Sequence, residues 1–425
     1  MKEKIKSIEE IAKEIEEKDG RLYLVGGAVR DTLLGREITD EDYCVTGLTQ
    51  EEFQSLFPEA KIRGKDFAVF DMEGKEFALA RKEVKTGKGH KEFEIQTDKK
   101  ITIEEDLARR DITVNSMAQH VLTKQIIDPF GGKKDLKECC IRATTNAFKE
   151  DPLRVYRVAR FASQLKFAVE NNTIAMMKSL KEELYFLSPE RVFTEFKKAL
   201  LSEKPSIFFE VLRKAEVLDV HFKEIQDLIG KVQPEKYHPE GDSYVHTLQV
   251  LDNSVILTNK VSIRFSALVH DLGKGQTPLE MLPHHYGHEE RGVKLVGDLA
   301  NRLKLPNEWI ACGKVSAKEH MRGGKFEDMK PSTKVSFIER VAKSKIGLDG
   351  LEIVVKCDKA RQRDVTEMTE INFAEIGKEC LKQINGKYIK EKYGNIQGIE
   401  LGNKLHEERI EWMKEKTKPS RKTGK

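Results

Sequence analysis

Two carboxylates separated by one residue form a candidate metal site. Asp40 and Asp42 flank Glu41 at the start of a predicted strand over residues 41–45. Side chains at positions i and i+2 of a strand point to the same side, so Asp40 and Asp42 should lie together while Glu41 points away. Adjacent carboxylates repel each other, and Mg²⁺, which binds one or two carboxylates together with substrate phosphates, would remove that repulsion. For an isolated pair, an acidic turn is the more ordinary interpretation.

The residues just before this pair make the interpretation more specific. Gly26 and Gly27 follow a predicted strand, residues 21–25, and precede a helix in which Arg30 lies one turn from the start. Glycines let backbone N–H groups approach an anion, and Arg30 could add a charge-assisted bond to phosphate. A glycine pair followed at this distance by paired aspartates describes a two-metal phosphoryl-transfer site, with one metal on the attacking hydroxyl and one on the leaving phosphate.

A third polar segment, RRDITVN, covers residues 109–115. Arg109 and Arg110 suit a triphosphate, and Asp111 and Asn115, four residues apart, could bracket a ribose hydroxyl. The alternative is a solvated helix start capped by Asp111.

A fourth group could read a nucleobase. Asp151, Arg154 and Arg157 are spaced at i, i+3 and i+6 of a helix predicted to open at residues 150–157. A carboxylate accepts from an exocyclic amine and a guanidinium donates to ring nitrogen or carbonyl acceptors, so such a pair would accept cytosine and adenine. It would reject uracil and guanine, because their buried polar groups would be mispaired. The alternative is a helix cap at Asp151, with arginines paired to acids.

Eight of the 11 histidines fall between residues 221 and 320, which indicates a second site. His270 and Asp271 end an apolar helical segment, while His246 and Asp358 lie in two other helical patterns. Burying an adjacent His–Asp pair is costly without a metal or partner. Imidazole and carboxylate together suit Mn, Fe, Ni, Co or Zn better than Ca. Lys274 could steady a phosphate, and three further histidines are possible ligands or phosphate contacts: His285, His288 and His320.

The elements that must position these residues change along the chain. Up to about residue 140 short strands alternate with helices, including a predicted hairpin turning at Glu73-Gly74 and a final strand pair within residues 119–128. After residue 150 the apolar residues recur at helical spacing, and no strand is expected. Residues 1–20 predict an amphipathic helix, and the polar, basic end of the chain predicts disorder.

Composition excludes several classes. The 425 residues are 34% charged and 39% hydrophobic, a globular profile with room for about three domains. No run of 18 apolar residues is available to span a membrane, and the charged N-terminus is unlike a signal peptide. Six scattered cysteines without paired spacing predict reduced thiols in a cytoplasmic protein. The net charge is only +4 because acidic residues balance most of the 75 basic ones, so this value is compatible with local basic surfaces.

The ordered motifs LVGGAVRD, DED, RRDITVN, DPFGGKKDL, EDPLRVYR and SPERVFTE, within residues 21–200, resemble those of the class II tRNA nucleotidyltransferases, the bacterial CCA-adding enzymes. The resemblance implies that Asp40 and Asp42 are catalytic metal ligands. It implies that Gly27, Arg30 and either Arg109 or Arg110 hold the triphosphate. It further implies that Asp151, Arg154 and Arg157 select the base. The stretch from Ala80 to Phe93 resembles a loop thought to help switch from C to A addition.

The pattern of His246, His270-Asp271 and Asp358 resembles the HD phosphohydrolase superfamily, and its order behind such a head resembles CCA enzymes that carry an HD domain. This resemblance implies metal-dependent phosphatase and phosphodiesterase activity. The expected fold is α+β: a mixed α/β head (1–140), an all-α neck and body that selects bases and binds RNA (141–224), a helical HD domain (225–365), and a helical C-terminal region with a disordered basic tail (366–425).

The expected activity is CCA addition to the tRNA 3′ end from CTP and ATP. Mg²⁺ is expected in the head and a transition metal such as Ni²⁺ or Mn²⁺ in the HD domain. The expected partner is the tRNA acceptor arm, with no membrane, for a monomer or homodimer. Three alternatives stay open: a poly(A) polymerase or an enzyme adding only CC or only A, an HD hydrolase with an inactive RNA-binding head, and an RNA chaperone with vestigial sites.

Overall fold

The computed structural model of the chain describes residues 6–38, 40–63, 68–85, 93–96, 98–236, 238–360 and 363–416. They belong to two compact units, residues 1–199 with 207–220 and residues 200–206 with 221–425. The predicted disordered tail beyond residue 416 and much of the predicted switching loop lie outside the described residues. None of the helices within the described part of the chain has the length and apolar character that a membrane crossing requires.

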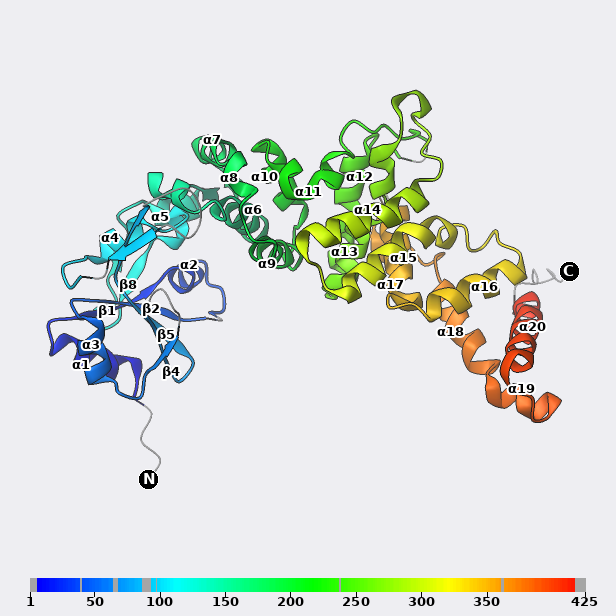
Figure 1. Ribbon diagram of the computed structural model, residues 1–425, viewed down its shortest axis with the longest axis horizontal. Helices are drawn as coiled ribbons and strands as arrows, with labels where there is room; N and C mark the ends of the chain where they lie inside the picture. The colour runs from blue at the N-terminus through cyan, green and yellow to red at the C-terminus, as the bar shows by residue number, and fades with distance from the viewer. Residues whose placement is uncertain are drawn as a thin grey trace, which may run out of the picture. The chain divides into compact units, whose positions relative to one another are not determined.

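The first unit is organised around a mixed sheet of seven strands in the order β3-β4-β5-β2-β1-β8-β9 (Figure 1). The central strand β2 pairs in parallel with β5 and antiparallel with β1, whose other neighbour is β8. The strands are β1 (Arg21–Val25), β2 (Asp42–Thr46), β3 (Lys61–Arg63), β4 (Val69–Met72), β5 (Lys75–Leu79), β8 (Ala118–His120) and β9 (Ile126–Ile127). The predicted hairpin at Glu73-Gly74 and the predicted final pair are confirmed as β4–β5 and β8–β9.

Both faces of the sheet are covered. Leu22 and Phe77 pack on one side with Phe53 of α3, and Tyr23 and Val25 pack on the other with residues of α4. The helices of this part are α1 (Ile8–Glu16), α2 (Gly27–Leu33), α3 (Gln50–Leu56), α4 (Ile103–Ala108) and α5 (Gly132–Lys137), and a separate pair of strands is formed by β6 (Lys82–Lys85) and β7 (Phe93–Gln96). The central position of β1 and β2 places the residues at their ends in the middle of the unit.

Helices follow, as predicted, with one exception. Their bounds are α6 (Arg154–Leu165), α7 (Asn171–Ser179), α8 (Lys181–Leu184), α9 (Pro189–Leu200), α10 (Ser206–Lys214) and α11 (Leu218–Gln226). The expectation of no strand after residue 150 is wrong for β11 (Ala168–Val169), which pairs in parallel with β10 (Cys140–Ile141). Two residues are too few to show an alternating pattern, so the sequence could not reveal this pair. The α+β fold class is confirmed.

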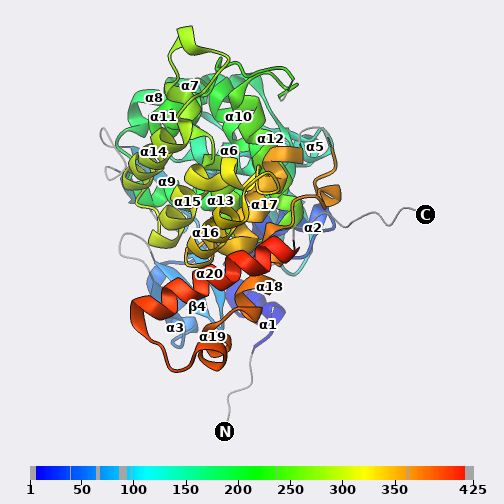
Figure 2. The ribbon, with the colours of Figure 1, turned by 90° about the vertical axis from the view of Figure 1, so that its right-hand side faces the viewer.

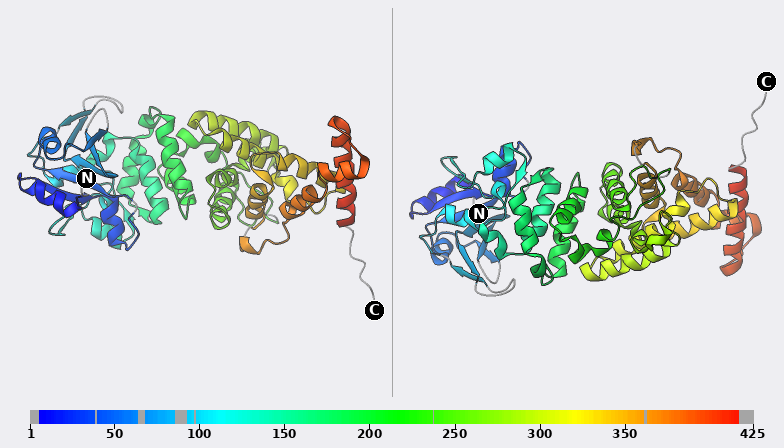
Figure 3. Two further views of the ribbon diagram at one scale, coloured as in Figure 1. Left: turned by 90° about the horizontal axis from the view of Figure 1, so that it is seen from below. Right: turned by 90° about the horizontal axis from the view of Figure 1, so that it is seen from above.

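The second unit is helical. Its helices are α12 (Ser243–Leu257), α13 (Val261–Val269), α14 (His288–Leu303), α15 (Asn307–Gly323), α16 (Pro331–Ala342), α17 (Gly347–Ala360), α18 (Phe373–Gln383), α19 (Gly386–Tyr393) and α20 (Gly398–Lys416). α14 and α15, joined by a short loop, pack side by side (Figure 3), and α20 packs against α16 and α18 (Figure 2). Buried side chains of α12, α13, α16 and α17 share one core.

A close contact joins the turn after α13 to the start of α14. Gly273 lies in the 3-10 turn Leu272–Gln276, and a Cβ atom at this position would fall 1.9 Å from the carbonyl oxygen of His288. Only glycine allows this approach, because a methyl group would overlap the backbone. The contact brings the chain just after Asp271 against His288.

Candidate active sites

A cavity of about 590 Å³ in the first unit collects nearly every candidate residue of the head and body. Its walls come from the β1–α2 turn, the start of β2, the segment after α4, and helices α6 and α9. The lining residues include Gly26, Gly27, Arg30, Asp40, Asp42, Arg81, Arg109, Arg110, Asp111, Asn115, Asp151, Arg154, Arg157, Phe161, Arg191 and Lys198. The cavity is therefore rich in guanidinium groups and holds the paired carboxylates.

Asp40 and Asp42 both face this cavity with exposed side chains. β2 begins at Asp42, so Asp40 lies just before the strand. The cavity walls shield part of the Asp42 carboxylate from water and so raise its pKa, the Arg110 guanidinium opposes that shift, and the nearby charge of Asp40 adds to it. Glu41 is turned away, as predicted, because it forms an ion pair with Lys75 and accepts a 3.1 Å hydrogen bond from the Tyr43 hydroxyl. The two carboxylates therefore line the same cavity, near enough for the charge of Asp40 to act on Asp42.

Of the glycine pair before α2, Gly26 is the residue whose backbone conformation requires glycine. The expected triphosphate contact of Gly27 stays a prediction. Gly26 has a φ of +69°, and a Cβ atom there would lie 2.7 Å from Nη1 of Arg110. Positive φ is readily adopted only by glycine, so the backbone conformation disfavours a larger residue at this position. The sequence analysis did not name Gly26 as a site residue, although it belongs to the same glycine pair.

Arg30 belongs to a network that crosses the floor of the cavity. Its Nη1 donates to Asn115 Oδ1 at 2.6 Å, and its Nε and Nη2 donate to Asp31. Asn115 Nδ2 in turn donates to Asp111 at 3.3 Å. Asp111 accepts from Arg157 Nε at 2.7 Å. Burial opposes ionisation of Asp111, but the Arg157 guanidinium holds its pKa below the usual value.

This network changes the interpretation of Asp111 and Asn115. They lie in a loop and the 3-10 turn Thr113–Asn115, not at a helix start. Their side chains connect Arg30 to Arg157, so they orient two arginines of the cavity. A second buried acid, Asp106, pairs with Arg109 at 2.7 Å and with Arg110 at 3.3 Å. Asp106 could not be predicted from the sequence, because an acid inside a helical pattern carries no signal of burial.

The predicted base-selecting residues are held in place on several sides. α6 begins at Arg154, so Asp151 lies before the helix and accepts from the backbone N–H of Leu153 at 3.0 Å. Its other oxygen accepts from Arg191 Nη2 at 3.0 Å. Arg154 is buried and donates to the carbonyl oxygens of Ala147 and Arg109. Asp151 therefore supports the helix start, as the alternative interpretation expects, and it also lines the cavity, while its role in base selection stays a prediction.

Arg191 was not named as a candidate by sequence reasoning. It lies inside the SPERVFTE segment, 40 residues from Asp151, and only the packing of α9 against α6 brings the two together. Phe161, also missed, lies 5.4 Å from the Arg30 guanidinium and 5.5 Å from that of Arg157.

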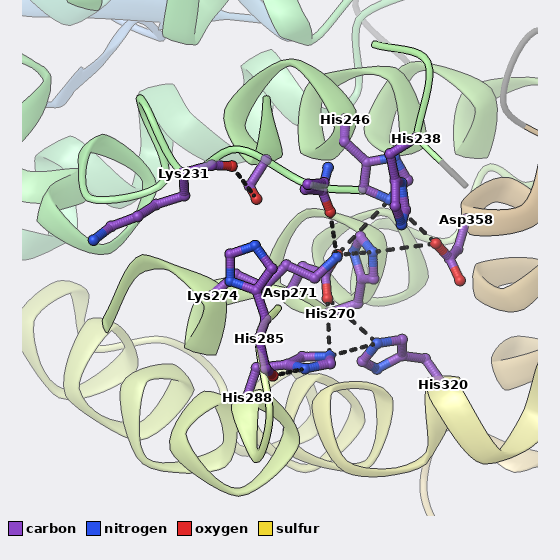
Figure 4. Close-up of polar contacts among 12 residues, drawn as sticks. Lys231, His238, His246, His270, Asp271, Lys274, His285, His288, His320 and Asp358 are labelled. Carbon is purple, nitrogen blue, oxygen red and sulfur yellow. Dashed lines mark hydrogen bonds and ion pairs between the residues drawn. The ribbon is translucent and has the colours of Figure 1, made fainter. Parts of the chain in front are cut away.

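The second unit brings together the four predicted metal-site residues (Figure 4). His246 comes from α12, His270 and Asp271 from the end of α13, and Asp358 from α17. His246 Nε2 lies 3.1 Å from Asp358 Oδ1, and His270 Nε2 lies 3.2 Å from Asp271 Oδ2. All four side chains are buried.

The donor atoms of this cluster fit a divalent cation. His270 Nε2, both carboxylate oxygens of Asp271 and Oδ2 of Asp358 are buried and accept or donate no well-directed hydrogen bond; their polar neighbours are ion-pair contacts within the cluster and with Lys274 and Lys359. His270 Nδ1 lies 2.7 Å from the carbonyl oxygen of Ala267, which assigns the proton to Nδ1 and leaves the Nε2 lone pair facing the carboxylates. Buried charges and lone pairs of this kind are costly unless a cation joins them. Lys274 Nζ, 2.6 Å from Asp271 Oδ2, compensates in part.

The three further histidines divide into two groups. His288 Nε2 and His320 Nε2 each lie 3.3 Å from Asp271 Oδ1, the oxygen opposite the one that faces His270. The sequence analysis named them only as possible ligands, and the structure places both at the cluster. His285 is different, because its Nδ1 lies 2.8 Å from Thr277 Oγ1 and its Nε2 lies 3.0 Å from the carbonyl oxygen of Val232. Both of its ring nitrogens are engaged, so it supports a loop.

Glu240 is a residue that sequence reasoning missed. Its Oε1 lies 2.7 Å from Nδ1 of His246 and 2.9 Å from Nδ1 of His238. Because Glu240 fixes the Nδ1 side of the His246 ring, it directs Nε2 toward Asp358 and Asp271. Such an acid raises the basicity of a ligating histidine and sets its orientation.

Paired aspartates beside a glycine turn, in a cavity rich in arginine, define a nucleotidyltransferase head, and the buried His/Asp cluster defines an HD domain. Residues 22–142 match the family described as Poly A polymerase head domain, residues 166–229 the probable RNA and SrmB-binding site of polymerase A, and residues 243–344 the HD domain. These matches agree with the class of enzyme that the sequence motifs resemble.

The chain is 44% identical over 324 residues to the Multifunctional CCA protein of Nitrosococcus oceani, covering 75% of this chain and 79% of the relative. It is also 44% identical over 327 residues to the Multifunctional CCA protein of Shewanella denitrificans, covering 75% and 78%. The chain belongs to the family of multifunctional CCA proteins, and the predicted family is confirmed.

Solved structures share the fold. The Thermotoga maritima CCA-adding enzyme complexed with tRNA aligns with a TM-score of 0.63 at 20% identity, covering 96% of this chain and 91% of that one. An apo form of a CCA-adding enzyme aligns with a TM-score of 0.63 at 21% identity, covering 95% and 88%.

Proposed function

We propose that this chain adds CMP, CMP and AMP in order to the 3′ end of tRNA, using CTP and ATP, and that its HD domain hydrolyses phosphoesters. Family membership supports the proposal. The observation that carries it is that Asp40, Asp42 and the base-selecting candidates Asp151 and Arg154 line one cavity. A triphosphate at the carboxylates would therefore present its base to the opposite wall.

In the head, Asp40 and Asp42 would hold Mg²⁺. When bound, magnesium would neutralise charge on the attacking ribose oxygen and on the leaving pyrophosphate, in the two-metal arrangement. We assign the triphosphate contact to Arg110 rather than Arg109, because Arg110 lies next to Gly26 and acts on the pKa of Asp42. The terminal hydroxyl oxygen of tRNA bonds to the α-phosphorus, the bond to pyrophosphate breaks, and the hydroxyl proton passes to solvent.

Base selection would fall to Asp151 and to the arginines beside it. Arg191 engages one oxygen of Asp151 and the N–H of Leu153 engages the other, which fixes the plane of a carboxylate that lines the cavity. Cytosine and adenine carry an exocyclic amine next to a ring acceptor, whereas uracil and guanine present a carbonyl. The tRNA acceptor arm would be recognised by shape and phosphate contacts, since duplex RNA hides its sequence in a deep groove. We assign residues 141–224 to base selection and RNA binding.

Replacing Asp151 with alanine is expected to loosen the choice of base more than it weakens triphosphate binding. The discrimination against UTP and GTP should fall by about 100-fold. A site built to hydrogen-bond one base rejects another because its own buried polar groups would be left without partners, and the alanine variant lacks the carboxylate that creates this penalty. Competition between CTP and UTP on one tRNA transcript measures this ratio. Continued exclusion of UTP and GTP by the variant would refute the assignment.

The order of addition tests the function as a whole. We offer tRNA transcripts that end before each of the three terminal positions, with CTP or ATP supplied alone. A CCA-adding enzyme extends the first two transcripts only with CTP and the third only with ATP, then stops. Continued addition of A would instead identify a poly(A) polymerase, and extension of only some transcripts would identify a CC-adding or A-adding enzyme.

In the HD domain, His246, His270, Asp271 and Asp358 would hold a divalent transition metal such as Ni²⁺ or Mn²⁺. When bound, the metal would lower the pKa of a water molecule and polarise the phosphate. Lys274 and Gln233 line the same cavity as Asp271 and would donate to phosphate oxygens. The water oxygen bonds to phosphorus, the ester P–O bond breaks, and the leaving oxygen takes up a proton.

A further inference from the structure

The cavity above the HD cluster extends well beyond the residues that would hold a metal. Its volume is about 750 Å³, and it reaches from Asp271, His288 and His320 to two side chains of the loop before α14, His284 and Tyr286. A site that only accepted a small phosphate group would not need a cavity of this size, since pockets of about 300–1,000 Å³ enclose ligands as large as a nucleotide.

His284 and Tyr286 form an exposed aromatic pair at this cavity. Their ring centroids lie 5.6 Å apart with an interplanar angle of 22°, and Tyr286 is 71% exposed. Single exposed aromatic residues are common on protein surfaces, but two stacked rings at the mouth of a buried catalytic cluster are a specific arrangement. Their flat faces suit another ring.

The loop that carries the pair is anchored from below. His285, between the two rings, is buried and contacts Thr277 and Val232, so the side chains before and after it are directed outward. Arg291 donates to the carbonyl oxygen of Tyr286 at 2.8 Å and to that of Gly273 at 3.2 Å. The backbone that carries the two rings is therefore anchored, and Tyr286 lies two residues before His288.

Polar donors lie deeper in the same cavity. Gln233 is buried, and its Nε2 has no hydrogen-bond partner. Lys274 Nζ donates to Gln233 Oε1 at 2.5 Å. From the interior outward, the cavity thus offers metal-binding oxygens, donors suited to a phosphate, and aromatic faces suited to a base. Lys325, which is exposed, and the half-buried Lys359, which lies 3.3 Å from Asp358 Oδ2, also line the cavity and would favour a negatively charged ligand.

We propose that His284 and Tyr286 are a stacking platform for the base of a nucleoside phosphate, whose phosphate group lies over Asp271. The platform distinguishes a nucleotide from a simple phosphoester, and it tolerates any base because every base has a π-face. The ligand is a terminal nucleotide, either free or at the end of an RNA. The inference rests on the proposed hydrolase activity of this domain.

The test compares substrates with and without a base. With Mn²⁺ or Ni²⁺ supplied, hydrolysis is measured for adenosine 2′,3′-cyclic phosphate, for a trinucleotide ending in the same group, and for the cyclic phosphate of 1-O-methylribose. Tyr286→Ala is expected to raise KM about tenfold for at least one base-containing substrate, with little change in kcat, and to leave the sugar phosphate unaffected. Whichever substrate shows the larger rise in KM identifies the source of the nucleotide. Tyr286→Phe keeps the ring and should behave as the wild type.

Equal changes for substrates with and without a base, or no change for any, would overturn the platform. A second measurement does not depend on turnover: 5-iodouridine 3′-phosphate is irradiated with the full chain, and the adduct is located by peptide mass spectrometry. An adduct on His284 or Tyr286 supports the platform even if hydrolysis is absent, in which case the hydrolase proposal alone fails. Hydrolysis without base dependence and without an adduct would support the hydrolase proposal and refute the stacking platform.

Discussion

Replacing Asp42 with alanine is expected to lower nucleotide addition by about 1,000-fold or more while tRNA binding stays within about twofold. The change removes one of two carboxylates that face the cavity together, and a loss of about 4 kcal/mol of transition-state stabilisation corresponds to this factor. Because Asp42 is exposed and begins a strand, the fold should be preserved. Single-turnover incorporation of labelled CMP measures the rate, and a filter-binding assay measures tRNA affinity.

The neighbouring residue provides a matched control. Glu41→Gln removes an adjacent carboxylate that pairs with Lys75, so addition should stay within about threefold of the wild type. If Asp42→Ala retained addition, or if both variants lost it equally, the assignment of Asp42 as a metal ligand would be wrong.

Local spacing was enough to identify some of the head site. The glycine pair and Asp40 and Asp42 stand near one another in the sequence, and each group lies at the end of a strand whose pattern is readable. Once β1 and β2 are neighbours in the sheet, these ends meet at one cavity. The assignment of catalytic roles to these residues remains a prediction.

Other parts of the site depend on contacts between distant segments. Asp106 pairs with Arg110, Arg191 with Asp151, and Glu240 with His246. The neighbouring residues in the sequence give no sign that these three side chains are buried or oriented. The same limit applied to the histidines. His285 lies in the loop before α14 and His288, three residues later, begins that helix, yet only His288 reaches Asp271. Which ring nitrogen is already engaged decides the role, and that is a property of the fold.

Replacing Asp271 with asparagine is expected to lower phosphoester hydrolysis by about 1,000-fold and to leave nucleotide addition within about twofold. One oxygen of Asp271 faces His270, and the other faces His288 and His320. Asparagine in its place removes the negative charge that would attract a metal ion on both sides of the carboxylate. Metal content, measured on the purified chain by mass spectrometry after loading with Mn²⁺ or Ni²⁺, should fall in parallel. Removing the metal from the wild type with a chelator should reproduce the loss, and adding it back should reverse it.

The control variant replaces a histidine of the same unit that lies outside the metal cluster, so that the fold is kept. His406→Gln suits this purpose, because His406 of α20 contacts Glu339 of α16 at 2.9 Å and does not line the HD cavity. It should keep both hydrolysis and metal content. Loss of hydrolysis together with addition in Asp271→Asn would indicate a general folding defect, and unchanged hydrolysis would exclude Asp271 from the metal site. The two activities depend on carboxylates in separate units, so each should be lost without loss of the other. Comparison of Asp42→Ala with Asp271→Asn measures this independence.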